Sequence, residues 1–256
     1  MFDTSNLKCE LEPALYLVPT PIGNLEDITF RAMRVLATAD IVACEDTRTT
    51  ASLLKKIEVH ANQLTSYHEY NEREKAPYLA DLIKQGKSVA LVSDAGTPAL
   101  SDPGYRLINS AIELGLKIIA LPGANALLPA LSSSGFPTNE FTFMGFPPQK
   151  KGRQTFLKRV SEQETTVILY ESTHRIIKLI SELGEHCGDD RQICIAREIS
   201  KIYEEYLRGT IGELKLVLAK RKELKGEIVV IIARKESEIK EESGNKYSNK
   251  NLEDEE

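Results

Sequence analysis

The chain has 256 residues, of which 41% are hydrophobic and 28% charged, and its net charge is −5. This is close to a globular average, and the length allows one large domain or two of ordinary size, each with a hydrophobic core. No apolar stretch approaches about 18 residues, and no basic segment precedes an apolar run at the N-terminus. We therefore expect neither a membrane span nor a signal peptide.

In chain order, short apolar segments alternate with longer amphipathic ones through the first half. The expected strands are 14–20, 39–45, 62–65, 88–94 and 117–123. The expected helices begin near residues 29, 47, 71, 101 and 124. This alternation predicts an α/β domain with a mostly parallel sheet.

The sequence changes character at 132–148, which is rich in Ser, Gly and Pro, so we expect the chain to cross into a second domain around 125–140. Beyond it, 191–198 and 202–209 predict an antiparallel hairpin, and the order of strands and helices predicts a mixed sheet. The predicted division is 1–13 as an N-terminal extension, 14–130 and 131–234 as two α/β domains, and 235–256 as a tail.

The tail is acidic, and we expect it to be disordered. It holds eight acidic and four basic residues, so it accounts for −4 of the net charge of −5 and leaves −1 on the rest of the chain. A nearly neutral body is compatible with a local basic patch that binds nucleic acid.

The four cysteines, at positions 9, 44, 187 and 194, form no CxxC pair. With only four histidines in the chain, this pattern argues against a structural zinc site, and we expect no metal. Scattered thiols in a chain without a signal peptide indicate the reducing environment of the cytoplasm.

Turns rich in Gly, Pro and small residues follow four of the expected strands. They are PTPIGNLEDIT (19–29), CEDTRTT (44–50), SDAGTPALSDPG (93–104) and LPGANALLPALSSSGF (121–136). Because ligands of α/β sheets bind at the carboxyl ends of strands, these turns predict one shared crevice. Within it we interpret Asp94 as a ligand-binding carboxylate and Asp102 mainly as a helix cap, with Pro103 as the first helical residue.

Other charged residues allow two interpretations. Asp46 is either a helix cap or a functional acid, and Arg48 is able to clamp a phosphate or a carboxylate. In the second half, LYESTHRI (169–176) and IAREISKIYEE (195–205) place charged groups beside a strand end and a hairpin turn. A basic cluster at 150–159 fits either phosphate binding or a solvated helix face.

Taken together, these segments resemble the tetrapyrrole-methylase family, and within it the branch that 2′-O-methylates a cytidine of small-subunit (16S) ribosomal RNA. The likeness covers roughly residues 14–232. The matching segments, in order, are VPTPIGNLEDIT, ACEDTR, SDAGTPALSDPG, LPGANA, SSSGFP, YESTHR, and ARE followed by Lys201.

The resemblance implies two α/β domains with S-adenosyl-L-methionine in the cleft between them, in a homodimer. It also implies residues that contact this cofactor. They are Pro21, Ile22, Gly23, Asp94, Ala95, Gly96, Asn125, Ala126, Tyr170 and Ala196.

The expected reaction moves a methyl group to a ribose 2′-oxygen, which must be aligned for attack and lose its proton. The residues left open as the base are Glu45, Asp46, Glu198 and Lys201, and catalysis mainly by positioning is the alternative. The residues expected to contact RNA phosphates are Arg48, Lys150, Lys151, Arg153, Arg175 and Arg197. The expected partner is small-subunit ribosomal RNA, in an assembled subunit.

Two other functions remain open at this point. One is a methyltransferase of the same fold that acts on a precorrin or, like diphthine-forming enzymes, on a protein side chain, because fold alone does not define substrate. The other is a non-catalytic RNA-binding ribosome-assembly factor, which the Gly- and Pro-rich turns at every cleft segment disfavour.

Overall fold

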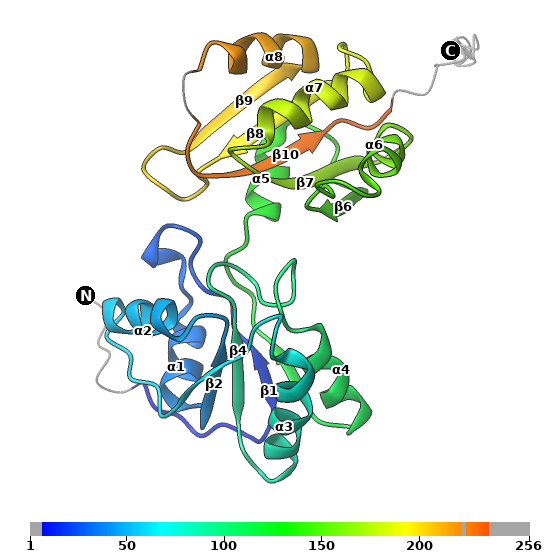
Figure 1. Cartoon of the computed structure of the whole chain (residues 1–256). Coiled ribbons are helices and arrows are strands. Elements are labelled where there is room, and N and C mark those ends of the chain that lie inside the picture. The colour runs from blue at the N-terminus through cyan, green and yellow to red at the C-terminus, as the bar shows by residue number, and fades with distance from the viewer. Residues whose placement is uncertain (1–6, 222–223, 236–256) are drawn as a thin grey trace, which may run out of the picture.

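The computed structural model describes residues 7–221 and 224–235 and has two lobes, each built on a five-stranded sheet (Figure 1). The predicted acidic tail falls almost entirely on 236–256, outside the described residues. None of the helices in the described ranges is long and apolar enough to cross a membrane.

The first sheet is wholly parallel, as predicted, with the strand order β3-β2-β4-β1-β5. Its strands are β1 (Leu15–Leu17), β2 (Ile41–Cys44), β3 (Leu64–Ser66), β4 (Val89–Val92) and β5 (Ile118–Ala120). The two inner strands β2 and β4 are buried at every residue, which matches their continuous apolar sequences.

Helices cover both faces of this sheet. They are α1 (Phe30–Thr38), α2 (Thr47–Lys56), α3 (Glu72–Lys84) and α4 (Tyr105–Glu113), and a 3-10 turn, η1 (Leu25–Asp27), precedes α1. Because strand side chains alternate, Val42 packs with α1 and α2 on one face, whereas Ile41 packs with α3 and α4 on the other. Thr29 and Asp46 cap α1 and α2 with their side-chain oxygens.

The second sheet is mixed, as predicted, with the order β6-β7-β10-β8-β9. Its strands are β6 (Phe141–Gly145), β7 (Thr166–Ser172), β8 (Gln192–Arg197), β9 (Glu205–Thr210) and β10 (Glu227–Ile232). Only β6 and β7 run parallel among these pairs, and β8 and β9 form the predicted antiparallel hairpin.

One face of the second sheet is covered by its own helices, and the other turns toward the first lobe. The first face packs against α6 (Arg153–Ser161), α7 (Ile176–Cys187) and α8 (Ile211–Ala219). The second packs against α5 (Leu127–Ser134) and against Ile22 of the first lobe. Because α5 spans the predicted boundary at 130/131 but packs on the second sheet, we propose that the boundary lies before α5.

The start of α4 differs from the prediction. The sequence placed the helix at Ser101, with Asp102 as the cap and Pro103 as the first helical residue, whereas α4 begins at Tyr105 after an N-cap at Gly104. Ala99 and Ser101 have φ values of 67°, which no α-helix contains. The interpretation of Asp102 as a helix cap is therefore wrong.

Candidate active site

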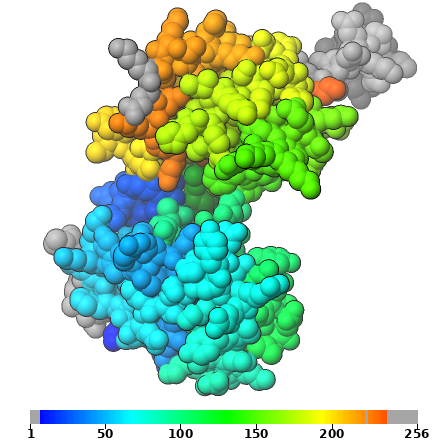
Figure 2. All heavy atoms as spheres, viewed as in Figure 1, coloured from blue at the N-terminus to red at the C-terminus, as the bar shows by residue number. Residues whose placement is uncertain are grey.

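A cavity of about 500 Å³ lies between the lobes, at the carboxyl edge of the first sheet. The first lobe contributes the turns after β1, β2, β4 and β5, and the second contributes the end of β7 and the start of β10. The space-filling view shows the lobes meeting at a waist, with the loop around 19–29 in blue beneath the upper lobe (Figure 2). The predicted crevice thus lies where four of the strand ends converge.

Seven of the ten residues predicted to contact a cofactor line this cavity. They are Ile22, Asp94, Ala95, Gly96, Asn125, Ala126 and Tyr170. The three predicted residues that do not line the cavity are Pro21, Gly23 and Ala196. Ala196 is fully buried within the face of the second sheet that packs on α5.

Gly23 lies where the two lobes touch. A Cβ at this position would lie 2.3 Å from Cγ of Lys201, in the turn of the β8–β9 hairpin. A larger residue at position 23 would require the Lys201 side chain to move. We therefore interpret Gly23 as a contact between lobes that holds the edge of the cavity.

Three carboxyl groups, Glu45, Asp94 and Asp102, lie on the first-lobe side of the cavity. Burial raises the pKa of Glu45, and the nearby charge of Asp94 raises it further. Burial also raises the pKa of Asp102 to about 6, with the charges of Glu45 and Asp94 acting in the same direction. A cationic ligand beside Glu45 and Asp94 would relieve their mutual repulsion, so this pair of carboxyl groups is suited to positive charge.

The backbone around Gly96 is held close to the cavity. Gly96 and Thr20 exchange two backbone hydrogen bonds of 2.9 Å, which tie the turn after β4 to the segment after β1. Gly96 has φ +86°, a conformation that favours glycine, and a Cβ there would contact Ile22 at 3.4 Å. The two turns therefore form one rigid wall.

The second-lobe wall includes aromatic side chains beside polar ones. Tyr170 makes edge-to-face contacts with Phe143 and Phe146, with ring centroids 4.9 and 5.5 Å apart. Phe146 lines the cavity and is 51% exposed, although the sequence did not point to it. Burial raises the pKa of Tyr170 to about 12, and the charge of Asp102 across the cavity raises it as well. Tyr170 therefore remains a neutral phenol at physiological pH.

The four candidate bases occupy different positions. Glu45 lines the cavity, whereas Asp46, Glu198 and Lys201 are not among its lining residues. Asp46 forms an ion pair with Arg48 over 2.7 Å, and its side chain caps α2.

The other two candidates, Glu198 and Lys201, pair with each other over 2.8 Å, and Lys201 also pairs with Glu227 over 3.1 Å. Burial raises the pKa of Glu198, but hydrogen bonds from Lys201 and from the backbone of Glu227, together with nearby positive charge, outweigh it, so the pKa of this carboxyl is lowered. Only Glu45 of the four thus faces the cavity.

Of the residues predicted to contact RNA, Lys150 and Lys151 are exposed in the turn before α6. Arg48 is also exposed, apart from its pairing with Asp46. Arg175 donates from Nε to Glu171 over 2.8 Å, and Arg197 donates to Glu205 over 3.3 Å. These two arginines therefore already take part in contacts within the second lobe.

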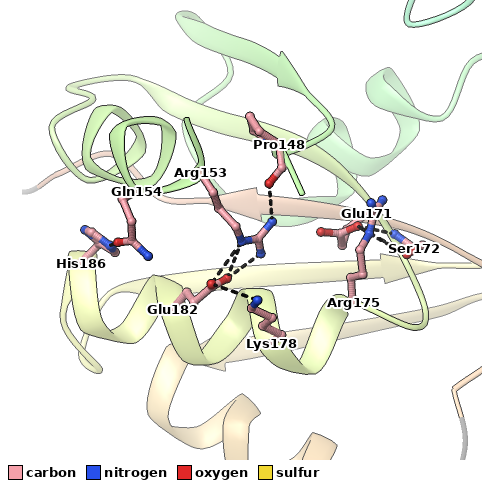
Figure 3. A network of polar contacts seen from close by, with 9 residues as sticks. All are labelled: Pro148, Arg153, Gln154, Glu171, Ser172, Arg175, Lys178, Glu182 and His186. Carbon is pink, nitrogen blue, oxygen red and sulfur yellow. Dashed lines mark hydrogen bonds and ion pairs between the residues drawn. The ribbon is translucent and has the colours of Figure 1, made fainter. Parts of the chain in front are cut away.

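Arg153 is buried rather than exposed. Its guanidinium donates to Glu182 on α7 over 2.9 Å and to the carbonyl of Pro148 over 2.9 Å (Figure 3). Its exposed fraction is 5%. The sequence left the basic cluster open between phosphate binding and a solvated helix face, but the helical period places this one arginine on the inner face of α6. The prediction of Arg153 as a phosphate contact is therefore wrong.

Across the residues that the structure describes, no group of His, Cys, Asp and Glu is arranged to hold a metal ion. The cysteines of the described segments are free.

The fold and the cavity define a class, namely a two-lobed α/β protein with a carboxylate-rich cavity between the lobes. Residues 14–215 match the family model of Tetrapyrrole (Corrin/Porphyrin) Methylases. The chain is 46% identical to ribosomal RNA small subunit methyltransferase I of Mesorhizobium japonicum, over 90% of this chain and 79% of that protein. It is 45% identical to the protein of that name in Hydrogenobaculum sp., over 90% of this chain and 99% of that one.

The chain therefore belongs to the tetrapyrrole methylases and, within them, to the ribosomal RNA small subunit methyltransferase I family. Methyltransferases of this family use S-adenosyl-L-methionine.

Solved structures support the fold at much lower identity. A diphthine synthase superposes with a TM-score of 0.65 at 14% identity, over 86% of this chain and 89% of the other. The methyltransferase CobJ superposes with a TM-score of 0.64 at 17% identity, over 86% and 94%. At such identities the likeness concerns the arrangement of the two lobes and not their substrates.

Sequence reasoning missed Asp102 and Phe146 as cavity residues. Asp102 was assigned to a helix cap because Ser-Asp-Pro is a common helix start. The signal that pointed elsewhere was Gly104 directly after this tripeptide, a residue typical of a turn that continues before the helix. Phe146 followed a glycine in a loop, where sequence alone does not show which surface an aromatic ring faces.

Proposed function

We propose that this chain transfers a methyl group from S-adenosyl-L-methionine to a ribose 2′-oxygen of a cytidine in small-subunit ribosomal RNA. The observation that carries the proposal is the carboxylate-rich cavity at the carboxyl edge of the parallel sheet, in a chain of this family. The names of its relatives, which are 43–48% identical, specify the small ribosomal subunit RNA as the acceptor.

The lining residues fit the proposed cofactor. The sulfonium and ammonium groups of S-adenosyl-L-methionine are cationic, and Asp94 and Glu45 offer negative charge on one side of the cavity. Ile22, Ile199 and Val229 provide apolar surface for the uncharged part of the molecule. When bound, the cofactor supplies an electrophilic methyl group.

The protein's own contribution is position and exclusion of water. The turns after β1 and β4 are joined through Thr20 and Gly96, so backbone hydrogen bonds hold one wall of the proposed cofactor site together. The aromatic pair Tyr170 and Phe146 borders the same cavity, and we propose that it shields this side of the bound cofactor from water. The acceptor oxygen must then be held about 3–3.5 Å from the methyl carbon, in line with the bond that breaks.

The RNA contacts that we retain are Arg48, Lys150, Lys151, Arg175 and Arg197. Lys150 and Lys151 support this role most directly because they are exposed on the β6–α6 turn, which begins beside Phe146 at the cavity. Phosphate contacts of this kind fix the position of the RNA, and the base and ribose are read in the cavity. We propose a homodimer acting on the assembled subunit.

The test is labelled-methyl transfer to three acceptors, namely isolated small ribosomal subunits, naked small-subunit RNA and large subunits. The proposal expects label in small-subunit RNA and none in large subunits. Label in naked RNA but not in subunits would show that free RNA, and not the assembled subunit, is the substrate. Absence of label from all three, with cofactor binding intact by calorimetry, would contradict the proposed function.

A further inference from the structure

The loop from Thr97 to Gly104 carries a carboxyl group into the cavity. Thr97, Leu100, Ser101 and Asp102 all line it, so the loop forms a side of the cavity and not merely a connection between β4 and α4. Asp102 is partly buried there. Because Asp102 does not cap α4, helix capping does not explain why a carboxyl group lies at this position.

The backbone of this loop is held in an unfavourable conformation. Ala99 and Ser101 both have φ +67°, in the left-handed region that residues with side chains rarely adopt. Gly104 packs so closely that a Cβ there would lie 2.8 Å from Cβ of Ala99. Strain of this kind persists where the surroundings impose one conformation, and it is concentrated at active sites.

The neighbours of Asp102 come from both lobes. On the first-lobe side are Glu45 at the end of β2 and Asp94 with Ser93 at the end of β4. Across the cavity is Tyr170 on β7, whose pKa the charge of Asp102 raises. The carboxyl group of Asp102 thus lies between the acidic groups of the first lobe and Tyr170 of the second lobe.

We propose that Asp102 is the general base that accepts the proton of the ribose 2′-hydroxyl. This inference rests on the proposed function. It gives the reaction a carboxylate between the acidic groups of the first lobe and Tyr170 of the second. Asp102 was not among the four bases that the sequence suggested.

The proton transfer balances without any further reactant. The O–H bond of the 2′-hydroxyl breaks, and its proton passes to a carboxylate oxygen of Asp102. The electron pair stays on the ribose oxygen, which takes the methyl group that the methyl donor supplies, and the donor keeps the electrons of its broken bond as a neutral thioether. The protonated carboxyl then returns its proton to solvent.

The environment suits Asp102 better than it suits Asp94 or Glu198. Its pKa of about 6 lies close to physiological pH, where a base combines ionisation with affinity for a proton. Asp94 accepts a hydrogen bond from the backbone of Asp46 and is exposed. Glu198 is tied to Lys201, which lowers its pKa and weakens it as a base.

The experiment compares Asp102→Asn and Asp102→Glu with the unchanged protein and with Asp81→Asn, an exposed position on α3 outside the cavity. Single-turnover methyl transfer to small subunits is measured from pH 5 to 9, and cofactor affinity is measured separately by calorimetry. We expect Asp102→Asn to slow transfer by roughly 100-fold or more and to remove the fall in rate below about pH 6. Cofactor affinity should stay within about threefold, and Asp102→Glu should restore part of the rate with a shifted pH profile.

Two results would overturn the inference. One is transfer by Asp102→Asn at the unchanged rate and with the same pH profile. The other is a loss of cofactor affinity that accounts for the whole loss of rate, because Asp102 would then hold the cofactor. Failure of the unchanged protein to methylate any ribosomal RNA is a different result, which contradicts the proposed function and the inference together.

Discussion

The carboxylate of Asp94 accepts a hydrogen bond from the backbone N–H of Asp46 over 3.2 Å. This bond joins the ends of β2 and β4, which are neighbours in the first sheet. The bond orients Asp94 at the cavity, near Glu45. The negative charge of Asp94 raises the pKa of Glu45. A carboxylate placed beside another one in this way is stabilised when a cation binds between them.

Asp94→Asn should weaken cofactor binding without unfolding the protein. The amide keeps an oxygen that accepts from Asp46, but the negative charge is lost. We expect the dissociation constant for S-adenosyl-L-methionine to rise roughly tenfold, which corresponds to about 1.4 kcal/mol. Calorimetric titration measures it, with Asp81→Asn as the control. Unchanged affinity would show that Asp94 does not face the bound cation.

Gly96→Ala should impair both stability and cofactor binding, whereas Gly86→Ala should impair stability alone. Both glycines have positive φ values, +86° and +95°, so alanine costs about 1–2 kcal/mol of folding free energy at either site. A Cβ at Gly86 would meet no heavy atom within 4 Å, whereas Gly96 borders the cavity. Denaturant titration and calorimetry of both variants separate the two effects. Equal cofactor affinities would place Gly96 outside the binding wall.

The Arg153–Glu182 pair should matter for stability because both side chains are buried, with relative exposures of 6% and 12%. Glu182→Ala leaves the guanidinium without its carboxylate and should cost about 3–5 kcal/mol of unfolding free energy. Lys178 contacts the same carboxylate over 3.9 Å but is 67% exposed. Lys178→Ala should therefore change stability by less than about 1 kcal/mol. Similar losses for the two variants would contradict the buried pair.

The exposed lysines of the β6–α6 turn should account for part of the salt dependence of RNA binding. Replacing Lys150 and Lys151 with alanine should flatten the slope of log affinity against log salt by about 0.7–0.9 for each phosphate that these lysines neutralise. The control is the pair Lys55 and Lys56, exposed at the far end of α2. If both double variants changed the slope equally, the turn would have no special part in binding.

The ionisation of Asp102 should lower the unfolding free energy of the protein as pH rises. Its folded-state pKa of about 6 exceeds the unfolded value of 3.8, so the folded protein binds more protons between these limits. Stability from this group is therefore greatest below about pH 4 and falls as pH rises through about 6. Asp102→Asn should raise the unfolding free energy at pH 7.5 by on the order of 1–2 kcal/mol and change it little at pH 4. Denaturant titrations at both pH values test the sign.

The sequence predicted the strands of the first sheet because each is a short apolar segment that a turn follows. β2 and β4 are buried on both faces, and their continuous apolar sequences are typical of strands in a parallel sheet. The hairpin of β8 and β9 was equally visible from its spacing. The start of α4 was misplaced, since Ser-Asp-Pro favours a helix while the packing of Gly104 against Ala99 delays it.

The site was predictable only in part. Asp94 and Gly96 follow a buried strand, and the rule that ligands bind at strand ends places them correctly in the cavity. The burial of Arg153 was not predictable, because its partner Glu182 lies 29 positions away on α7. Asp102 and Tyr170 face each other only through the packing of the two lobes, which local sequence does not record.

The central claim is methylation of one ribose in small-subunit RNA, and it is tested most directly by mapping 2′-O-methyl groups at nucleotide resolution. Small subunits from cells that lack the protein would be treated with the purified chain and S-adenosyl-L-methionine, in parallel with Asp94→Asn. The account predicts a new 2′-O-methyl group at a single cytidine, formed much more slowly by the variant. A methyl group on a base, or no new modification in subunits while the cofactor binds normally, would contradict it.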